Sequence, residues 1–274
     1  MKQRIISGTL CVVVLALVLC FYNTLVLEAA VCVLSGIAVF EMLSANSIKE
    51  HKPFLYTSVA AAAIMPYFVR LNLLGVLIAL YLVVTVILTL RFHSSTPFEK
   101  IAFSVLATIS ISLSFNCLVF LRNGFKEAGL FYILVAFGSA WFADTGAYFT
   151  GMLLGKHKLC PNISPKKTVE GAVGGVVWNI GLLCLLAFVY TKIYAGMGTV
   201  LSVNYLNIGI LAVATAFAGM AGDLIASVIK RQIGIKDYGN LIPGHGGIMD
   251  RFDSILFTTP VIYFVTQFID IISK

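Results

Sequence analysis

Charged residues are scarce in this sequence. Asp, Glu, Lys and Arg make up only 11% of its 274 residues, whereas 59% are hydrophobic and the mean hydropathy is +0.98. A soluble domain carries about 25% charged residues. The apolar excess is too large for one buried core, so we exclude a soluble globular protein and expect lipid to solvate much of the surface.

CxxC cysteine pairs, a cleavage site after the first apolar run and internal repeats are also missing. No two of the six cysteines form a CxxC pair, so we expect neither a zinc site nor a disulfide framework. The apolar run after Met1–Arg4 continues past Phe21 without an A-x-A-like cleavage site. It predicts a retained first helix rather than a signal peptide. We find no repeat and no low-complexity segment.

What the sequence has instead is a series of long apolar runs. A transmembrane helix needs about 20 apolar residues. We therefore predict an all-α, polytopic integral membrane protein with about nine transmembrane helices. The predicted spans are Ile5–Tyr22, Thr24–Leu43, Phe54–Val69, Leu73–Leu90, Ile101–Leu121, Gly129–Gly151, Gly171–Thr191, Tyr205–Ile229 and Ser254–Ile272.

The distribution of positive charge predicts the orientation. Cytoplasmic loops of membrane proteins carry an excess of Lys and Arg. Placing the N-terminus in the cytoplasm puts most of the 19 Lys and Arg residues on that side. The exceptions are Arg70, Arg122, Lys126, Lys192 and Lys274. We therefore expect a cytoplasmic N-terminus and an external C-terminus, which requires an odd number of spans.

The run Tyr205–Ile229 carries a polar stripe. Asp223, Ser227 and Lys230 are spaced i, i+4 and i+7, so in a helix they point within a sector of roughly 60°. Lys230 and Arg231 alone are explained equally well as cations that reach the membrane surface from a helix end. Asp223 lies about two turns deeper. A carboxylate there is costly unless it faces a wet cavity or a partner, which favours a functional role.

A glycine-rich loop follows that helix. Gly239–Gly247 places glycines around His245, which lets backbone N–H groups approach an anion closely. Asp250, Arg251 and Asp253 come next. Two acids at this spacing share a helical face and suit Mg²⁺ that also binds substrate phosphates. Capping of a helix N-terminus explains one of the acids, but not both together with the neighbouring arginine and histidine.

A third polar cluster begins in the run Gly129–Gly151. Asp144 and Tyr148 share a helical face, and Lys166 and Lys167 follow in the next loop. Paired lysines suit phosphate binding, although the excess of positive charge in cytoplasmic loops also places lysines here. Both interpretations of the two lysines stay open.

The remaining polar residues carry weaker expectations. We interpret Glu41, near the cytoplasmic end of the second predicted span, as a solvated acid, and we place Glu28 near the outer face. The loop histidines His51, His93 and His157 have no partner that the sequence identifies. None of these residues is assigned a role.

Taken together, these motifs resemble a known family. The chain is similar to phosphatidate cytidylyltransferases, also called CDP-diacylglycerol synthases, in Ser227-x-x-Lys230-Arg231, Lys236-Asp237, Pro243–Gly247 and Asp250–Asp253. The family's other characteristic region resembles Asp144–Tyr148 with Ser164–Gly171. The likeness covers the C-terminal half in detail and the N-terminal half only as a pattern of helices.

The resemblance implies an enzyme of phospholipid biosynthesis that converts CTP and phosphatidate into CDP-diacylglycerol and pyrophosphate. It implies Mg²⁺, leaves a second cation open, and places the site on the cytoplasmic side of the cell membrane. It also implies a homodimer, and we expect no nucleic-acid partner. The chain 1–274 is then one membrane domain, with scaffold or dimer helices in 1–128 and catalytic helices and loops in 129–274.

The expected site residues fall into three groups. The expected catalytic residues are Lys230, Arg231, His245 and Asp250. The expected substrate-binding residues are Asp144, Lys166, Lys167, Ser227, Lys236 and Arg251. The expected metal ligands are Asp223, Asp250 and Asp253. We expect these three stretches of chain to converge at the inner leaflet.

Two alternatives stay open. An ion-coupled transporter also carries intramembrane acids, but its polar site lies near the membrane midplane and it often shows an inverted repeat. A CTP-dependent enzyme acting on another lipid phosphate, or a CTP-using lipid kinase, has similar phosphate chemistry and a different acyl pocket.

Overall fold

The computed structural model describes residues 2–125 and 128–273. The chain forms two compact units, one from residues 1–120 and 232–252 and the other from 121–231 and 253–274. Lys126 and Lys274, which the charge argument assigns to the external side, lie outside the described residues.

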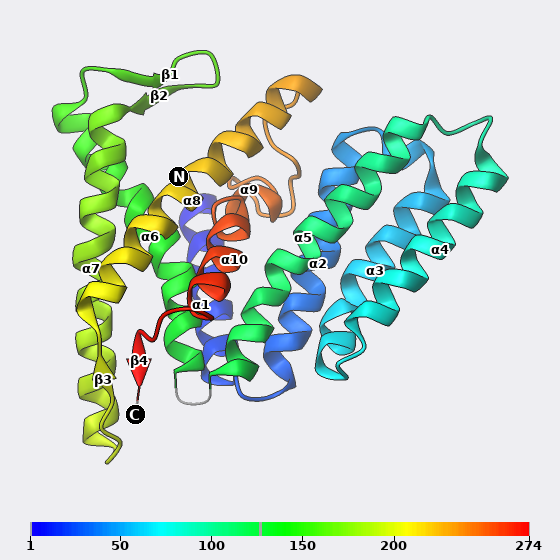
Figure 1. The fold of residues 1–274 in the computed structure, drawn as a ribbon. Helices are drawn as coiled ribbons and strands as arrows, with labels where there is room; N and C mark the ends of the chain where they lie inside the picture. Colours follow the sequence, from blue (N-terminus) through cyan, green and yellow to red (C-terminus); the bar gives the residue numbers. More distant parts are fainter. Residues whose placement is uncertain (1, 126–127, 274) are drawn as a thin grey trace. The chain divides into compact units, whose positions relative to one another are not determined.

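The first unit is a set of packed helices. α2 packs along α3, and α3 packs along α4 (Figure 1). Thr24 caps α2 by accepting a hydrogen bond from the backbone N–H of Val26 at 3.2 Å. The hydroxyls of Ser58 and Tyr81 lie 2.9 Å apart and join α3 to α4. The elements are α1 (Lys2–Cys20), α2 (Leu25–Ala45), η1 (Ile48–Glu50), α3 (Lys52–Arg70), α4 (Leu74–Phe92), most of α5 (Phe98–Gly124) and α9 (Met249–Phe252).

The second unit is built around α6 and α7, which lie side by side (Figure 1). Glycine permits this close approach, because a Cβ on Gly175 would lie 2.8 Å from the carbonyl oxygen of Ala143. Asn179 of α7 donates a hydrogen bond to the carbonyl of Ala212 in α8 at 2.8 Å. The elements are α6 (Gly129–Leu154), β1 (Lys158–Cys160), β2 (Ser164–Thr168), α7 (Val169–Gly196), β3 (Ser202–Val203), most of α8 (Tyr205–Ile233), α10 (Ile255–Val265) and β4 (Ile272–Ser273).

The chain is mostly helical, but two short antiparallel sheets interrupt the predicted all-α pattern. β1 and β2 form a hairpin between α6 and α7, and β3 pairs with β4 so that Val203 lies opposite Ile272. The predicted span Ser254–Ile272 is wrong at its C-terminal end, because the helix there ends at Val265. The backbone of 272–273 is hydrogen-bonded to β3 instead of continuing a helix.

Helices form at all nine predicted spans, and the description as a polytopic membrane protein is confirmed. Among the described residues, six helices are long and apolar enough to cross a membrane, and Ile6–Cys20 and Ile255–Val265 are shorter apolar helices. α3 is not among these six helices. The number of spans therefore stays a prediction.

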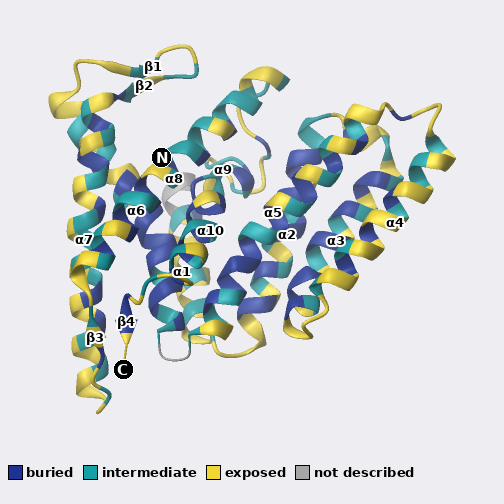
Figure 2. Cartoon of the chain, in the orientation of Figure 1, coloured by how far each residue is buried: buried dark blue, intermediate teal, exposed yellow. Residues whose placement is uncertain are grey.

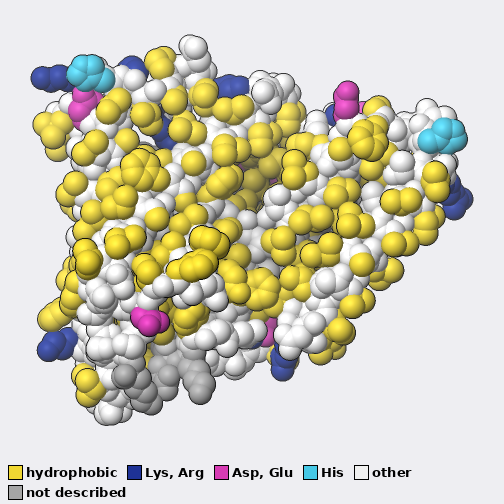
Figure 3. All heavy atoms as spheres, viewed as in Figure 1, with side chains coloured by type: hydrophobic (Ala, Val, Ile, Leu, Met, Phe, Trp, Pro, Cys, Tyr) yellow, Lys and Arg dark blue, Asp and Glu magenta, His cyan; other side chains and the backbone are white. Residues whose placement is uncertain are grey.

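Many large apolar side chains lie on the surface. α4 and α7 bury few of their residues, and exposed residues occur along each of these helices (Figure 2). Leu80 and Val86 on α4 and Val177 on α7 are examples. In the space-filling view, hydrophobic side chains cover most of the visible surface and charged side chains are few (Figure 3). Such surfaces suit lipid rather than water as the surrounding solvent.

Candidate active site

Acids and bases from distant parts of the sequence meet in the second unit. Asp223 of α8 forms an ion pair with Lys167, whose Nζ lies 2.6 Å from Asp223 Oδ2. Asp144 of α6 interacts electrostatically with both residues. Asp253, which precedes α10, interacts with Asp223, Asp144 and Lys230. These five residues are called the charged cluster below.

The ionised carboxyl of Asp253 is destabilised in this cluster by burial and by a neighbouring negative charge. Burial and, as the second cause, the negative charge of Asp223 raise the pKa of this carboxyl to about 6. The backbone N–H of Ser254 donates to Asp253 Oδ1 at 2.7 Å and offsets part of this cost. Gly222 permits the approach of α8, because a Cβ there would lie 2.6 Å from the Asp253 carbonyl oxygen. Crowded carboxylates of this kind are stabilised by a bound cation.

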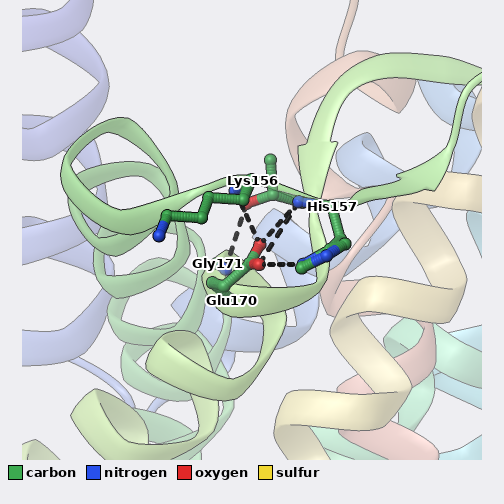
Figure 4. Close-up of polar contacts among 5 residues, drawn as sticks. Lys156, His157, Glu170 and Gly171 are labelled. Carbon is green, nitrogen blue, oxygen red and sulfur yellow. Dashed lines mark hydrogen bonds and ion pairs between the residues drawn. The ribbon is translucent and has the colours of Figure 1, made fainter.

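Glu170 fixes the base of the hairpin that carries the two lysines. Its carboxylate accepts hydrogen bonds from the backbone N–H of Lys156 at 3.1 Å, and from the backbone N–H and Nδ1 of His157 at 3.2 and 2.6 Å (Figure 4). Thr168 caps α7 by accepting from the N–H of Gly171 at 3.1 Å. His157 thus has a partner that the sequence did not identify, and both ends of the hairpin are tied to α7.

Lys166 and Lys167 are neighbours in β2, and their side chains lie on opposite faces of this strand. Successive side chains of a strand point to opposite faces. Lys166 is exposed, whereas Lys167 Nζ is buried beside Asp223. No atom in 2–125 or 128–273 accepts a hydrogen bond from this Nζ with good geometry, and Asp223 contacts it as a counter-ion. An ammonium carries three N–H donors, so this one retains capacity for a further anion.

α8 runs unbroken through the predicted polar stripe, so Asp223, Ser227 and Lys230 have the helical spacing that the sequence predicts. Ser227 and Lys230 are half-buried, whereas Arg231 is exposed. Because Lys230 interacts with Asp253, the stripe belongs to the charged cluster at both of its ends.

The glycine-rich loop lies in the first unit and is held by Asp250. Asp250 Oδ2 accepts hydrogen bonds from the backbone N–H groups of Tyr238 at 2.8 Å and Gly247 at 3.1 Å. Gly244 and Gly246 have φ of 78° and 84°, a left-handed conformation that favours glycine. Asp250 therefore shapes the loop, in addition to the metal-binding role that the sequence predicts for it.

His245 connects the loop to α1. The Ser7 hydroxyl donates to the Pro243 carbonyl at 3.0 Å and lies 2.8 Å from His245 Nδ1. Arg251 Nε donates to the His245 carbonyl at 2.7 Å, so this arginine also supports the loop. Lys236 is exposed.

The predicted site residues divide between the two units. The second unit holds Asp144, Lys166, Lys167, Asp223, Ser227, Lys230, Arg231 and Asp253, and the first holds Lys236, His245, Asp250 and Arg251. Within the second unit, three distant stretches of sequence do meet, at the charged cluster. The convergence of Asp250 with Asp144 and Asp223 stays a prediction.

Glu41 is a loop-contacting residue that the sequence did not assign to the site. Its interpretation as a solvated acid is wrong, since it is only 6% exposed. Its carboxylate accepts hydrogen bonds from the backbone N–H groups of Ile248 at 3.1 Å and Met249 at 2.8 Å. These hydrogen-bond partners of Glu41 lie about 200 residues away in the sequence. The spacing of residues within one helix therefore could not predict the contact.

The charged cluster fits Mg²⁺ by residue type. Among 2–125 and 128–273, no three His, Cys, Asp or Glu side chains form a preassembled metal cage. Mg²⁺ does not require such a cage, because it binds through one or two carboxylates and completes its shell with water and substrate phosphates. Asp223 and Asp253, whose charges repel each other, are suitable carboxylates for a cation that arrives with a nucleotide.

Comparison with known proteins extends the likeness to nearly the whole chain. The model of the Cytidylyltransferase family matches residues 2–269. The phosphatidate cytidylyltransferase of Bacillus subtilis (strain 168) is 34% identical over 272 residues, which cover 97% of each chain. That of Staphylococcus aureus (strain COL) is 35% identical over 273 residues, 96% of this chain and 97% of the relative. The chain therefore belongs to the phosphatidate cytidylyltransferase family.

Proposed function

We propose that this chain transfers the cytidylyl group of CTP to phosphatidate and releases CDP-diacylglycerol and pyrophosphate. The observation that carries this proposal is the charged cluster, in which Asp144, Asp223 and Asp253 meet Lys167 and Lys230 within a largely apolar unit. A reaction between two phosphorylated substrates needs both kinds of group, because acids hold a divalent cation and bases bind phosphate oxygens. The full-length relatives named above are phosphatidate cytidylyltransferases, which supports the same activity here.

The chemistry is a nucleotidyl transfer. A phosphate oxygen of phosphatidate forms a bond to the α-phosphorus of CTP, while the bond from that phosphorus to the bridging oxygen breaks and its electrons leave with pyrophosphate. A phosphate monoester has a second pKa of about 6, so the nucleophile is mostly dianionic at neutral pH. Little general-base catalysis is required, and the protein contributes mainly positioning and neutralisation of charge.

Within the cluster, Lys167 and Lys230 bind phosphate oxygens in this proposal. Asp223 holds the Lys167 ammonium in place, while the spare N–H donors of that ammonium meet the substrate. Ser227 lies one turn from Asp223 on the same helix and supplies a hydroxyl donor. The other proposed phosphate ligands are Arg231, Lys236 and Arg251. Lys166 is left out of this set, because it is exposed and its side chain points to the opposite face of β2 from Lys167.

We propose that Asp223 and Asp253 of the cluster are ligands of Mg²⁺. Asp250 of the first unit stays a metal ligand by prediction from the sequence. When bound, the ion neutralises the phosphate charge of the nucleotide and polarises the reacting group. Asp144 either adds a ligand or orients Lys167, with which it interacts. Removal of divalent cations with EDTA should abolish turnover, and activity that persists in EDTA would exclude the metal from the mechanism.

The substrate requires a membrane location, because the acyl chains of phosphatidate stay in lipid while its headgroup meets CTP. We propose nine spans, with the N-terminus on the cytoplasmic side of the cell membrane. We also propose a homodimer, which a measurement of the mass of the detergent-solubilised particle tests. In a variant without reactive cysteines, Asn162→Cys should react with an impermeant thiol reagent only from the cytoplasmic side and Lys192→Cys only from outside. The opposite pattern would overturn the orientation.

The direct test of the activity is an assay of the purified chain in detergent with labelled CTP, phosphatidate and Mg²⁺. We expect one CDP-lipid and one pyrophosphate for each CTP consumed. A matched reaction with diacylglycerol replaces the phosphate nucleophile by a hydroxyl and should give no product. Phosphorylation of diacylglycerol, or a CDP product only with a different lipid phosphate, would contradict the proposed substrate.

A further inference from the structure

A buried acid of α2 holds the glycine-rich loop from outside the sequence motif. Glu41 lies near the cytoplasmic end predicted for α2 and is 6% exposed. Its two carboxylate oxygens accept separately, Oε1 from the N–H of Ile248 at 3.1 Å and Oε2 from that of Met249 at 2.8 Å. A buried carboxylate is stable only when such donors compensate its lost hydration. Glu41 is therefore committed to the backbone that directly follows the loop.

Two of the loop glycines are explained by the same carboxylate. A Cβ on Gly239 or on Gly247 would overlap the Glu41 carboxylate. Neither glycine has a positive φ, unlike Gly244 and Gly246, so backbone conformation does not require glycine at 239 or 247. These two glycines leave the space in which the carboxylate lies. Any side chain there must displace it from its two hydrogen bonds.

Glu41 and Asp250 act on the same stretch of backbone. The N–H of Gly247 donates to Asp250 Oδ2 at 3.1 Å, and the next two N–H groups, of Ile248 and Met249, donate to Glu41. The three consecutive donors thus end on two carboxylates. Because Asp250 directly follows this segment, loss of the Glu41 contacts frees both the loop and the aspartate that the proposed function uses.

We propose that Glu41 is a positioning residue, whose carboxylate holds Gly239–Gly247 and Asp250 in the geometry that binds substrate phosphate. This inference rests on the proposed function for its kinetic consequence, but its structural consequence is independent of the reaction. Supporting groups of this kind typically change activity by about 10- to 100-fold when removed.

Glu41→Gln tests the proposal with little change in volume. One amide oxygen still accepts, but the amide NH₂ faces a backbone N–H, so one of the two contacts is lost. Glu28→Gln is the matched control, since Glu28 is a second buried acid of the same helix and forms an ion pair with Arg70 at 4.0 Å. Both variants remove one buried negative charge from α2.

We expect Glu41→Gln to lower kcat/KM for CTP by about 10-fold or more, and Glu28→Gln to change it less than about threefold. Hydrogen exchange across 237–252 should become faster only in Glu41→Gln, while the unfolding temperatures of the two variants stay close. Unchanged exchange in Glu41→Gln overturns the positioning role even if activity falls. Faster exchange with unchanged kinetics overturns its link to the reaction.

A double-mutant cycle gives a second test. Gly247→Ala should reduce kcat/KM by about 10-fold in the wild type, because its methyl group displaces the Glu41 carboxylate, and much less in a Glu41→Ala background. Equal losses in both backgrounds would show that Gly247 is required for another reason and would contradict the inference. A wild type that makes no CDP-lipid refutes the proposed function, whereas the exchange experiment still decides the role of Glu41.

Discussion

Asp223→Asn should reduce the transfer of cytidylyl groups from CTP to phosphatidate by about 10²–10³-fold, the usual loss when one charge-stabilising group is removed. Asp223 is the member of the charged cluster that pairs with Lys167 and also interacts with Asp144 and Asp253. Asn keeps the shape of the side chain but loses the charge that binds a cation and holds the lysine. The measurement is the initial rate of CDP-lipid formation at saturating Mg²⁺.

The control must separate chemistry from folding, because removal of Asp223 also takes the counter-ion from a buried ammonium. Asp270→Asn removes a charge from an exposed position of the same unit and should leave the rate within about twofold. Thermal unfolding in detergent is compared for both variants. A correctly folded Asp223→Asn protein with more than half of the wild-type rate would remove Asp223 from the site.

The positions of the helices follow from the sequence because lipid imposes a simple rule. A run of about 20 apolar residues has few alternatives to a helix in a membrane. The rule fails at the C-terminus, where the predicted span continues to Ile272 but the helix ends at Val265 and Ile272 pairs with Val203. That pairing depends on a strand about 70 residues earlier, so hydropathy contains no information about it.

The charged residues were found because a carboxylate in an apolar helix is conspicuous, as Asp144 and Asp223 illustrate. Their partners were harder to assign. The sequence left Lys166 and Lys167 equivalent because it treated their segment as a loop, and only the strand β2 gives them opposite directions. Glu41 looked like an ordinary acid at a helix end, since the glycines that accommodate it lie in a remote loop.

The difference between the two lysines yields a sharp prediction. Lys167→Met should lower kcat/KM for CTP by about 100-fold, because it removes a buried ammonium that interacts with the carboxylates of Asp223 and Asp144. Met retains most of the length and apolar character of the lysine stem. Lys166→Met, which changes the adjacent and exposed lysine in the same way, should cost less than about threefold.

This pair of variants discriminates between two reasons for the presence of the lysines. If they serve only as positive charge in a cytoplasmic loop, both substitutions remove the same charge and should have equal, small effects on turnover. If Lys167 binds substrate phosphate while Asp223 holds the lysine in place, only the substitution at the buried position should lower turnover. The binding of one substrate should then weaken more than the binding of the other. Equal rates for Lys166→Met and Lys167→Met would refute the role of Lys167, whatever the activity of the wild type.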